Sequence, residues 1–389
     1  QMWSVALVLV VLQRFHSPTL AGLAAFLSVV PGLVVSPISG ALLDRHGRLR
    51  LILLDFIVAA VSMLTLSALL VTDRLAPPVL LVVVGLGSLT GPLSMSGMRS
   101  LFPLVVPRGL WDRANGIDSG IFALSLVLGP ALAGYLVGWV GGEGVFLVTA
   151  GVYVLAMLAL IGLREPEAST TGPRPSLARS AWQALTYVVR NPSLRGIAAT
   201  LFTGNISGGI ISIALPVLVF GRFHGTPADV GALWMVSGLA TVCAGLLAGR
   251  LNTEGRERFV VALGMGISAL AAGALALVSV FAVSDAVFVV GGLALGAPLV
   301  LLAVTMLLFG IAGGPIDVGL FSLRQRRTDP QWFGRVFAVS MSLNFAGFPA
   351  GAALGGPLAE RSVTLALLVG VAVSIASAVI PYLTIPREG

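Results

Sequence analysis

Long apolar runs dominate this sequence and limit what it can fold into. Again and again, about twenty or more mostly nonpolar residues follow one another before a short turn interrupts them. A run of roughly 20 apolar residues spans the hydrocarbon core of a bilayer as an α-helix. Charged residues make up only 10% of the chain, whereas a soluble domain carries about 25%. The sequence therefore predicts an all-α protein that crosses a membrane many times.

The runs predict twelve helices, six on each side of a polar segment at 164–192. In the first group we expect helices at 2–14, 18–43, 49–72, 78–106, 115–140 and 144–163. In the second group we expect them at 195–221, 227–249, 258–282, 299–323, 332–359 and 362–385. The first run is too short to span a bilayer, so we expect a truncated first helix. An apolar, glycine-rich stretch at 283–298 predicts either a hairpin or a longer helix end.

The polar segment predicts a linker followed by an amphipathic helix. Residues 165–175 are rich in Pro, Ser, Thr and Gly, as linkers are. Apolar residues then recur at helical spacing up to Arg190: Leu177, Ala181, Trp182, Leu185 and Val189. This pattern is typical of a helix lying on the membrane surface, although an ordinary packed helix would also produce it. We therefore expect a bundle at 1–164, a linker at 165–192 and a bundle at 193–389.

The placement of arginine predicts the sidedness of the chain. All 23 basic residues are Arg, and 18 of them are assigned to loops on the linker side, among them Arg324, Arg326 and Arg327. Four lie in the opposite loops. By the positive-inside rule, the linker faces the cytoplasm. Because the Arg residues are spread over many short loops rather than one face, no nucleic-acid partner is expected.

The two halves share a spacing of prolines. Gly91-Pro92 lies fifteen residues before Pro107, counted from the proline, and Gly314-Pro315 lies the same distance before Pro330. A duplicated six-helix unit leaves weak internal similarity of this kind. The spacing therefore predicts two pseudo-symmetric six-helix bundles.

The loop after the second run carries a motif of small and charged residues. Gly40, Asp44, Arg45, Gly47, Arg48 and Arg50 resemble the signature loop of the major facilitator superfamily, Gly-x-x-x-Asp-Arg-x-Gly-Arg-Arg, except that Leu49 replaces a basic residue. Gly47 permits a tight turn, and Asp44 can pair with an Arg or a helix N-terminus of the other half. The resemblance implies a latch that holds one conformation of a rocking transporter.

A second motif lies in the fifth run. Gly116, Ser125, Gly129, Pro130 and Gly134 resemble the antiporter motif of the same superfamily, Gly-x8-Gly-x3-Gly-Pro-x2-Gly-Gly, with Ser125 and Ala133 in place of two glycines. Small residues let helices approach closely, and proline permits a bend. The resemblance implies export in exchange for protons, and plain helix packing is the competing explanation. The stretches 99–108 and 334–337 are similar to the branch of enterobactin exporters and macrolide efflux pumps.

Four charged residues lie inside apolar runs, where an ion costs several kcal/mol. They are Asp55, Arg99, Asp118 and Asp317. A carboxylate near Arg99 can exchange a proton for ion pairing as its access changes, so these residues are candidates for proton coupling. All four fall in the linker-side half of their runs, which indicates ion pairs at a gate as the alternative, favoured for Asp55 and Asp317.

A substrate cavity is expected near the bilayer midplane, between the first, fourth, seventh and tenth helices. Its candidate residues are Met95, Asn205 and Met306, joined by Asn344 from the eleventh helix. A cavity with few fixed charges suits amphipathic or lipophilic cargo. The two asparagines are equally suited to hydrogen bonds between helices.

No catalytic, metal or cofactor site is expected. The three His lie far apart in loops, Cys243 is the single cysteine, and there is no Gly-x4-Gly-Lys phosphate loop. The resemblance implies a monomeric secondary transporter of the cell membrane that exports a small amphipathic or lipophilic compound by alternating access, driven by the proton gradient. A lipid or lysophospholipid carrier and an uptake symporter are alternatives within transport. A non-transporting receptor or scaffold is the alternative outside it, but it would not need the loop at 40–50.

Overall fold

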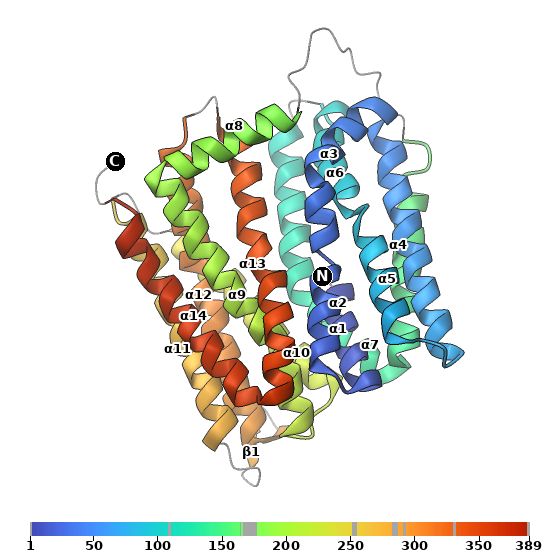
Figure 1. Cartoon of the computed structure of the whole chain (residues 1–389), viewed down its shortest axis with the longest axis vertical. Helices are drawn as coiled ribbons and strands as arrows, with labels where there is room; N and C mark the ends of the chain where they lie inside the picture. Colours follow the sequence, from blue (N-terminus) through green and yellow to red (C-terminus); the bar gives the residue numbers. More distant parts are fainter. Residues whose placement is uncertain are drawn as a thin grey trace.

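The computed structural model describes residues 2–107, 110–163, 165, 177–250, 255–281, 287–290, 293–329 and 332–386. Its long helices run side by side along the long axis of the molecule (Figure 1). This arrangement confirms the predicted helical membrane fold.

The helices before the linker mostly follow the predicted runs. They are α1 (Met2–Phe15), α2 (Pro18–Leu27), α3 (Val30–His46), α4 (Arg48–Val71), α5 (Pro77–Ser88), α6 (Gly91–Val105) and α7 (Trp111–Ala159). Two predicted helices are each broken in the middle, between α2 and α3 and between α5 and α6. Pro31 and Pro92 lie in the first turn after each break, where a proline is tolerated because it has no N–H to donate.

Two predicted helices, 115–140 and 144–163, are merged in α7. The helical stretch is interrupted at Gly141, whose φ of 74° and ψ of −179° are not helical. Residues that carry a side chain rarely adopt this φ, whereas glycine does so readily. Gly141 therefore allows the chain to change direction here without a loop.

The helices after the linker also match the predicted runs. They are α9 (Pro192–Gly221), α10 (Pro227–Ala248), α11 (Glu257–Phe281), α12 (Ala297–Arg327), α13 (Phe333–Arg361) and α14 (Val363–Thr384). Within the linker, α8 (Leu177–Arg190) lies where the amphipathic helix is predicted. Side chains cap several of them: the Asn191 Oδ1 accepts from the Leu194 N–H at 3.2 Å, and Thr226 forms a capping box with Asp229. Caps of this kind satisfy the free N–H groups of a first helical turn.

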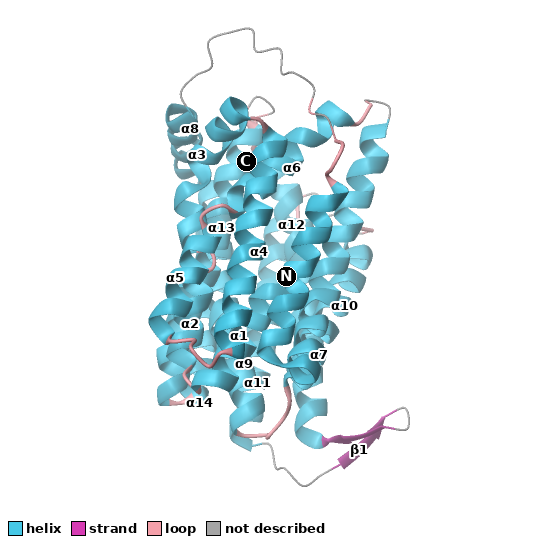
Figure 2. Cartoon of the chain, turned by 90° about the vertical axis from the view of Figure 1, so that its right-hand side faces the viewer, coloured by secondary structure: helices cyan, strands magenta, loops and turns pink. Residues whose placement is uncertain are grey.

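The stretch at 283–298 contains a hairpin rather than a longer helix end. Strands β1 (Val287–Val290) and β2 (Leu293–Gly296) pair antiparallel, with Val287 opposite Gly296. The hairpin projects from the end of the bundle opposite α8 (Figure 2).

Nine segments of the described chain are long and apolar enough to cross a membrane. One of them, Gly120–Ala159, has 40 residues and contains the turn at Gly141. The helix α1 is apolar but shorter, and α13 is not among the nine although it lies alongside them. The chain is therefore a multi-pass membrane protein, and the count of twelve spans stays a prediction.

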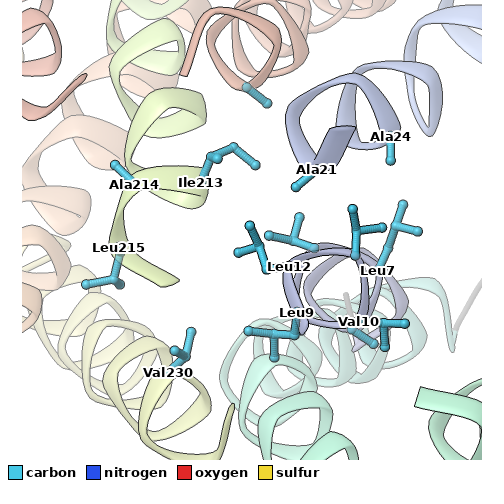
Figure 3. Close-up of a cluster of buried hydrophobic side chains, with 14 of the residues drawn as sticks. Leu7, Leu9, Val10, Leu12, Ala21, Ala24, Ile213, Ala214, Leu215 and Val230 are labelled. Atoms are coloured by element: carbon cyan, nitrogen blue, oxygen red, sulfur yellow. The ribbon is translucent and has the colours of Figure 1, made fainter. Parts of the chain in front are cut away.

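The largest hydrophobic cluster forms around α1. Leu7, Leu9 and Leu12 are buried there, and Leu7 and Leu12 lie on the side of α1 that faces Ala21 and Ala24 of α2 (Figure 3). Ile213 and Leu215 of α9 and Val230 of α10 complete the same cluster. Helices from both sides of the linker thus share one core.

The structure corrects one prediction about the basic residues. We predicted that the tenth helix ends at residue 323 and that Arg324 lies in the following loop. Instead, α12 continues to Arg327, and Arg324 is a fully buried helical residue.

Candidate functional site

The loop at 40–50 is held to Glu165, the first residue of the linker. Gly47 separates α3 from α4 with a φ of 87°, as predicted for a tight turn. Next to it, Arg48 forms an ion pair with Glu165 at 3.3 Å, and the Leu49 N–H donates to the same carboxylate at 3.0 Å. The contact therefore joins the loop to the linker and does not reach the second bundle.

The contact predicted for Asp44 across the halves falls outside the part of the chain that the structure describes. Arg45 and Arg50 are exposed, while the surroundings of Gly40 are likewise not among the described residues. The latch therefore stays a prediction.

The environment of Glu165 favours its charged form. Partial burial alone would raise the pKa of this carboxyl group, but hydrogen bonds from the Leu49 and Arg48 N–H groups and the Arg48 guanidinium outweigh it and lower the pKa. Glu165 therefore carries a negative charge at neutral pH and holds the 47–49 turn in place.

Glycines bring α7 and α10 into close contact. A Cβ on Gly134 would lie 2.3 Å from the Pro227 carbonyl oxygen and 2.7 Å from the Gly231 Cα. Further along, the missing side chain of Gly238 makes room for Val127. Gly129 and Pro130 of the same motif are buried, and the Ser125 hydroxyl donates to the Phe122 carbonyl at 2.7 Å. The surroundings of Gly116 lie outside the described part of the chain.

A similar contact joins α2 to α13. A Cβ on Gly22 would lie 2.3 Å from the Ala352 carbonyl oxygen, and one on Gly356 would lie 2.6 Å from the Pro18 carbonyl oxygen. The Thr19 N–H also donates to the Glu360 carboxylate at 3.1 Å. The contact involves the first half of α2 and the last part of α13. The helices before and after the linker are therefore packed together at the end away from α8 (Figure 1).

The charged residues inside the helices lie in different surroundings. Asp55 in α4 is 5% exposed, whereas Asp118 in α7 and Asp317 in α12 are accessible to solvent. The side chain of Arg99 lies outside the described part. None of the three carboxylates takes part in an ion pair with a described residue, so their coupling and gating roles stay predictions.

The cavity candidates are not equivalent. Met95 is 59% exposed, and Asn205 is half-buried and donates to the Leu201 carbonyl at 3.0 Å. Met306 is fully buried in the large hydrophobic cluster, and Asn344 is buried between α12 and α13. The interhelical role that we considered for Asn344 fits its contact with Arg324.

Arg324 is a buried cation that the sequence analysis missed. Its guanidinium carbon lies 5.9 Å from the Phe321 ring centroid and 5.2 Å from that of Phe337. Its Nη2 donates to the Asn344 Oδ1 at 2.9 Å, with the amide oriented so that its nitrogen donates to the Ser340 carbonyl. Its Nε and Nη1 have no hydrogen-bond partner among the described residues. A signal was present in the sequence, because Phe321 lies three residues before Arg324, on the same helix face if the helix continues.

No group of three or more His, Cys, Asp or Glu side chains in the described ranges is arranged to hold a metal ion. The site consists of ionic contacts at helix ends and of close contacts between helices at glycine residues.

Comparison with known proteins identifies the family of this helical membrane protein. The sequence profile of the Major Facilitator Superfamily matches residues 1–298. The MFS-type transporter y4rN of Sinorhizobium fredii is 37% identical over 390 residues, covering 100% of this chain and 91% of that protein.

Two further relatives are named as efflux proteins. The multidrug efflux pump Tap of Mycolicibacterium fortuitum is 29% identical over 364 residues, covering 90% of this chain and 83% of the pump. Macrolide efflux protein A of Streptococcus pyogenes is 22% identical over 370 residues, covering 92% of this chain and 84% of that protein. The predicted resemblance to the macrolide efflux branch is thereby confirmed.

Solved structures share the fold at low sequence identity. The nucleoside transporter NupG superposes with a TM-score of 0.75 at 12% identity, covering 98% of this chain and 95% of NupG. A bacterial homologue of the iron transporter ferroportin, in an inward-facing state, gives 0.72 at 15% identity, covering 100% of this chain and 95% of that structure. With the profile match and the helical architecture, these comparisons lead to one conclusion: the chain belongs to the Major Facilitator Superfamily and is a multi-pass membrane transporter rather than an enzyme.

Proposed function

We propose that this transporter exports a small amphipathic or lipophilic compound by alternating access, using the proton gradient. In this proposal the bundles at 1–164 and 193–389 move against each other, and the linker at 165–192 faces the cytoplasm. The protein works as a monomer in the cell membrane and needs no cofactor.

The single observation that carries the proposal is the position of the contacts between the two groups of helices. Glycine contacts join α2 to α13 and α7 to α10 at the end away from α8. Backbone contacts of this kind are broken by a small rotation, because they contain no flexible side chain that could follow the movement. In alternating access the two groups separate at this end and approach each other at the other.

The direction of transport rests on the relatives. Tap and macrolide efflux protein A are named as efflux proteins, and both align with about nine-tenths of this chain. The scarcity of fixed charges within the described helices supports a lipophilic cargo. A lipid or lysophospholipid carrier is the alternative.

Purified protein in proteoliposomes with an imposed pH gradient tests the proposal. We expect uphill movement of at least one compound from a panel of antibiotics, siderophores and lysolipids, and only while protons can flow back. Movement down a gradient of the compound alone, unaffected by pH, would show a facilitator instead.

The proton-carrying residue is tested in the same vesicles. We propose that Asp55, Asp118 or Asp317 carries the proton, so one of the three Asp→Asn variants should lose uphill transport but still exchange substrate. Asp73→Asn is the control, because Asp73 is an exposed loop residue paired with Arg14. If all three variants still couple transport to the gradient, none of these residues carries the proton.

A further inference from the structure

The helix α8 lies across the ends of the long helices instead of parallel to them (Figure 1). It is followed at once by α9, which begins at Pro192, and it lies beside the start of α13. In a membrane protein, the ends of spanning helices lie at the level of the lipid headgroups. The outer surface of α8 therefore lies in the interfacial layer.

The two faces of α8 differ in a way that fits this position. Ala184 and Val188 are buried, and Val188 packs into a cluster with α9, α12 and α13. On the opposite face, Trp182 is 69% and Val189 is 50% exposed. An exposed tryptophan next to apolar residues is typical of a helix whose outer face contacts the boundary between headgroups and acyl chains.

A groove of about 490 Å³ begins beside Trp182 and lies between α8 and Trp332, the residue that precedes α13. Its aromatic wall is formed by Trp182, Tyr187 and Trp332, and the rings of Tyr187 and Trp332 stack at 5.3 Å. Its polar wall includes Gln183 and Arg190. The groove thus combines a large apolar surface with a cation.

Several polar atoms in the groove are able to bind an anion. The Tyr187 oxygen accepts from the Asp329 N–H at 3.2 Å, so its own hydrogen is still available to donate. Gln183 offers an amide N–H₂, and Arg190 offers a guanidinium. In contrast, the Asn191 side chain is already engaged in hydrogen bonds within the protein, because it donates to the Arg327 carbonyl and accepts from the Leu194 N–H.

The surrounding charge is positive. Arg195 donates to the Val189 carbonyl at 3.4 Å, and Arg327 lies beside Asn191. Within the described residues, neither these two nor Arg190 forms an ion pair with a carboxylate. Asp329 is the nearby opposing charge, and it leaves an excess of cations at this corner.

We propose that the groove between α8 and α13 binds an anionic phospholipid. The headgroup phosphate is bound by Arg190, Gln183 and the Tyr187 hydroxyl, while an acyl chain lies along Trp182 and Val189. Because α8 is the helical part of the linker and packs against α13, a bound lipid fastens the linker to the C-terminal helices.

Brominated lipids test the proposal, since bromine on an acyl chain quenches tryptophan fluorescence only on contact. The protein is reconstituted in phosphatidylcholine with increasing brominated phosphatidylglycerol, and separately with brominated phosphatidylcholine. We expect saturable quenching that favours phosphatidylglycerol, and a clear decrease of this preference in Trp182→Phe, in which the exposed tryptophan of the groove is absent. Equal quenching by the two lipids would overturn the proposal.

Charge variants identify the headgroup contact. One arginine near a membrane surface changes affinity roughly fivefold, so Arg190→Gln should weaken the preference for phosphatidylglycerol by about that factor. Arg361→Gln, an exposed arginine at the opposite end of α13, is the matched control and should change nothing. Gln183→Glu, which places a negative charge in the groove, gives a second variant if Arg190→Gln does not fold. An unchanged preference in the folded variants would refute the site.

A competition experiment separates a lipid from a free anion. Millimolar inorganic phosphate should not relieve quenching by brominated phosphatidylglycerol, because it has no acyl chain to add apolar contact to the binding of the phosphate group. If phosphate alone displaces the lipid, the site recognises any phosphate and the lipid proposal is wrong.

Discussion

Arg324 combines a high energetic cost with few compensating contacts. A buried guanidinium is expensive to desolvate, and replacing buried ions with apolar side chains of similar size is often neutral or stabilising. Here the charge is offset by two phenyl rings and Asn344, while Nε and Nη1 lack partners among the described residues. A cation kept under these conditions indicates a role in function rather than in folding.

This argument predicts a divergence between stability and transport. In Arg324→Met we expect an unfolding temperature equal to or above that of the wild type, because the desolvation cost disappears. Transport should fall at least fivefold. Thermal unfolding in detergent and vesicle transport measure the two effects, with the exposed Arg256→Met as control. A lower unfolding temperature with normal transport would mean that Arg324 is a structural residue.

Glu165 predicts a pH effect with a definite sign. Its pKa is lowered in the folded protein. The ion pair with Arg48 therefore stabilises the fold at pH values above 4.5, the ordinary pKa of glutamate. That stability is lost as the pH falls through the lowered pKa. We expect Glu165→Gln to be about 1 kcal/mol less stable at pH 7, and the difference to shrink at pH 4 and below. Equal stability at pH 7, measured by thermal unfolding, would contradict the role of this contact.

At the scale of the element, the contact between α7 and α10 depends on the absence of a side chain. An added methyl group on Gly134 meets backbone atoms of Pro227 and Gly231, which cannot rotate away. Gly138 lies one turn further along α7, and a Cβ added there would have no atom within 4 Å. The two glycines therefore form a matched pair for substitution.

We expect Gly134→Ala to open this contact and Gly138→Ala to leave it unchanged. Overpacking costs about 1–3 kcal/mol, which corresponds to roughly a tenfold change in the population of the separated state. The readout is maleimide labelling of Leu233→Cys, a buried position on α10, in a Cys243→Ser background. Equal labelling of the two glycine variants would show that the contact does not limit opening.

The sequence predicted most elements but not their contacts. Apolar runs and their flanking turns depend on neighbouring residues, so the positions of α4, α9 to α11 and α14 follow from local pattern alone. The breaks between α2 and α3 and between α5 and α6 were missed because a proline within an apolar run is compatible with a bend as well as with a new helix. The hairpin was one of two readings of 283–298, and only the pairing of Val287 with Gly296 decides between them.

The candidate site was predicted unevenly for a related reason. The turn at Gly47 and the small residues of the fifth run follow from residue type, but their partners Glu165 and Gly231 lie far away in the sequence. Arg324 was assigned to a loop because three arginines in four residues look like a helix end. Burial at that point comes from Phe337 and Asn344 on another helix, which a local pattern does not reveal.

At the scale of the whole molecule, the proposed mechanism requires the contact between α2 and α13 to open in every cycle. The Thr19 N–H and the Glu360 carboxylate are 3.1 Å apart across this contact, so cysteines at the two positions are within reach of a short, reducible thiol cross-linker. We expect Thr19→Cys/Glu360→Cys, in a Cys243→Ser background, to lose transport when cross-linked and to recover it after reduction. Each single variant should transport normally under both conditions. Substrate binding from the side of α8 should survive cross-linking, because the contact holds the opposite end closed. Full transport by the cross-linked protein would mean that the two groups of helices do not separate here, and alternating access about this contact would have to be abandoned.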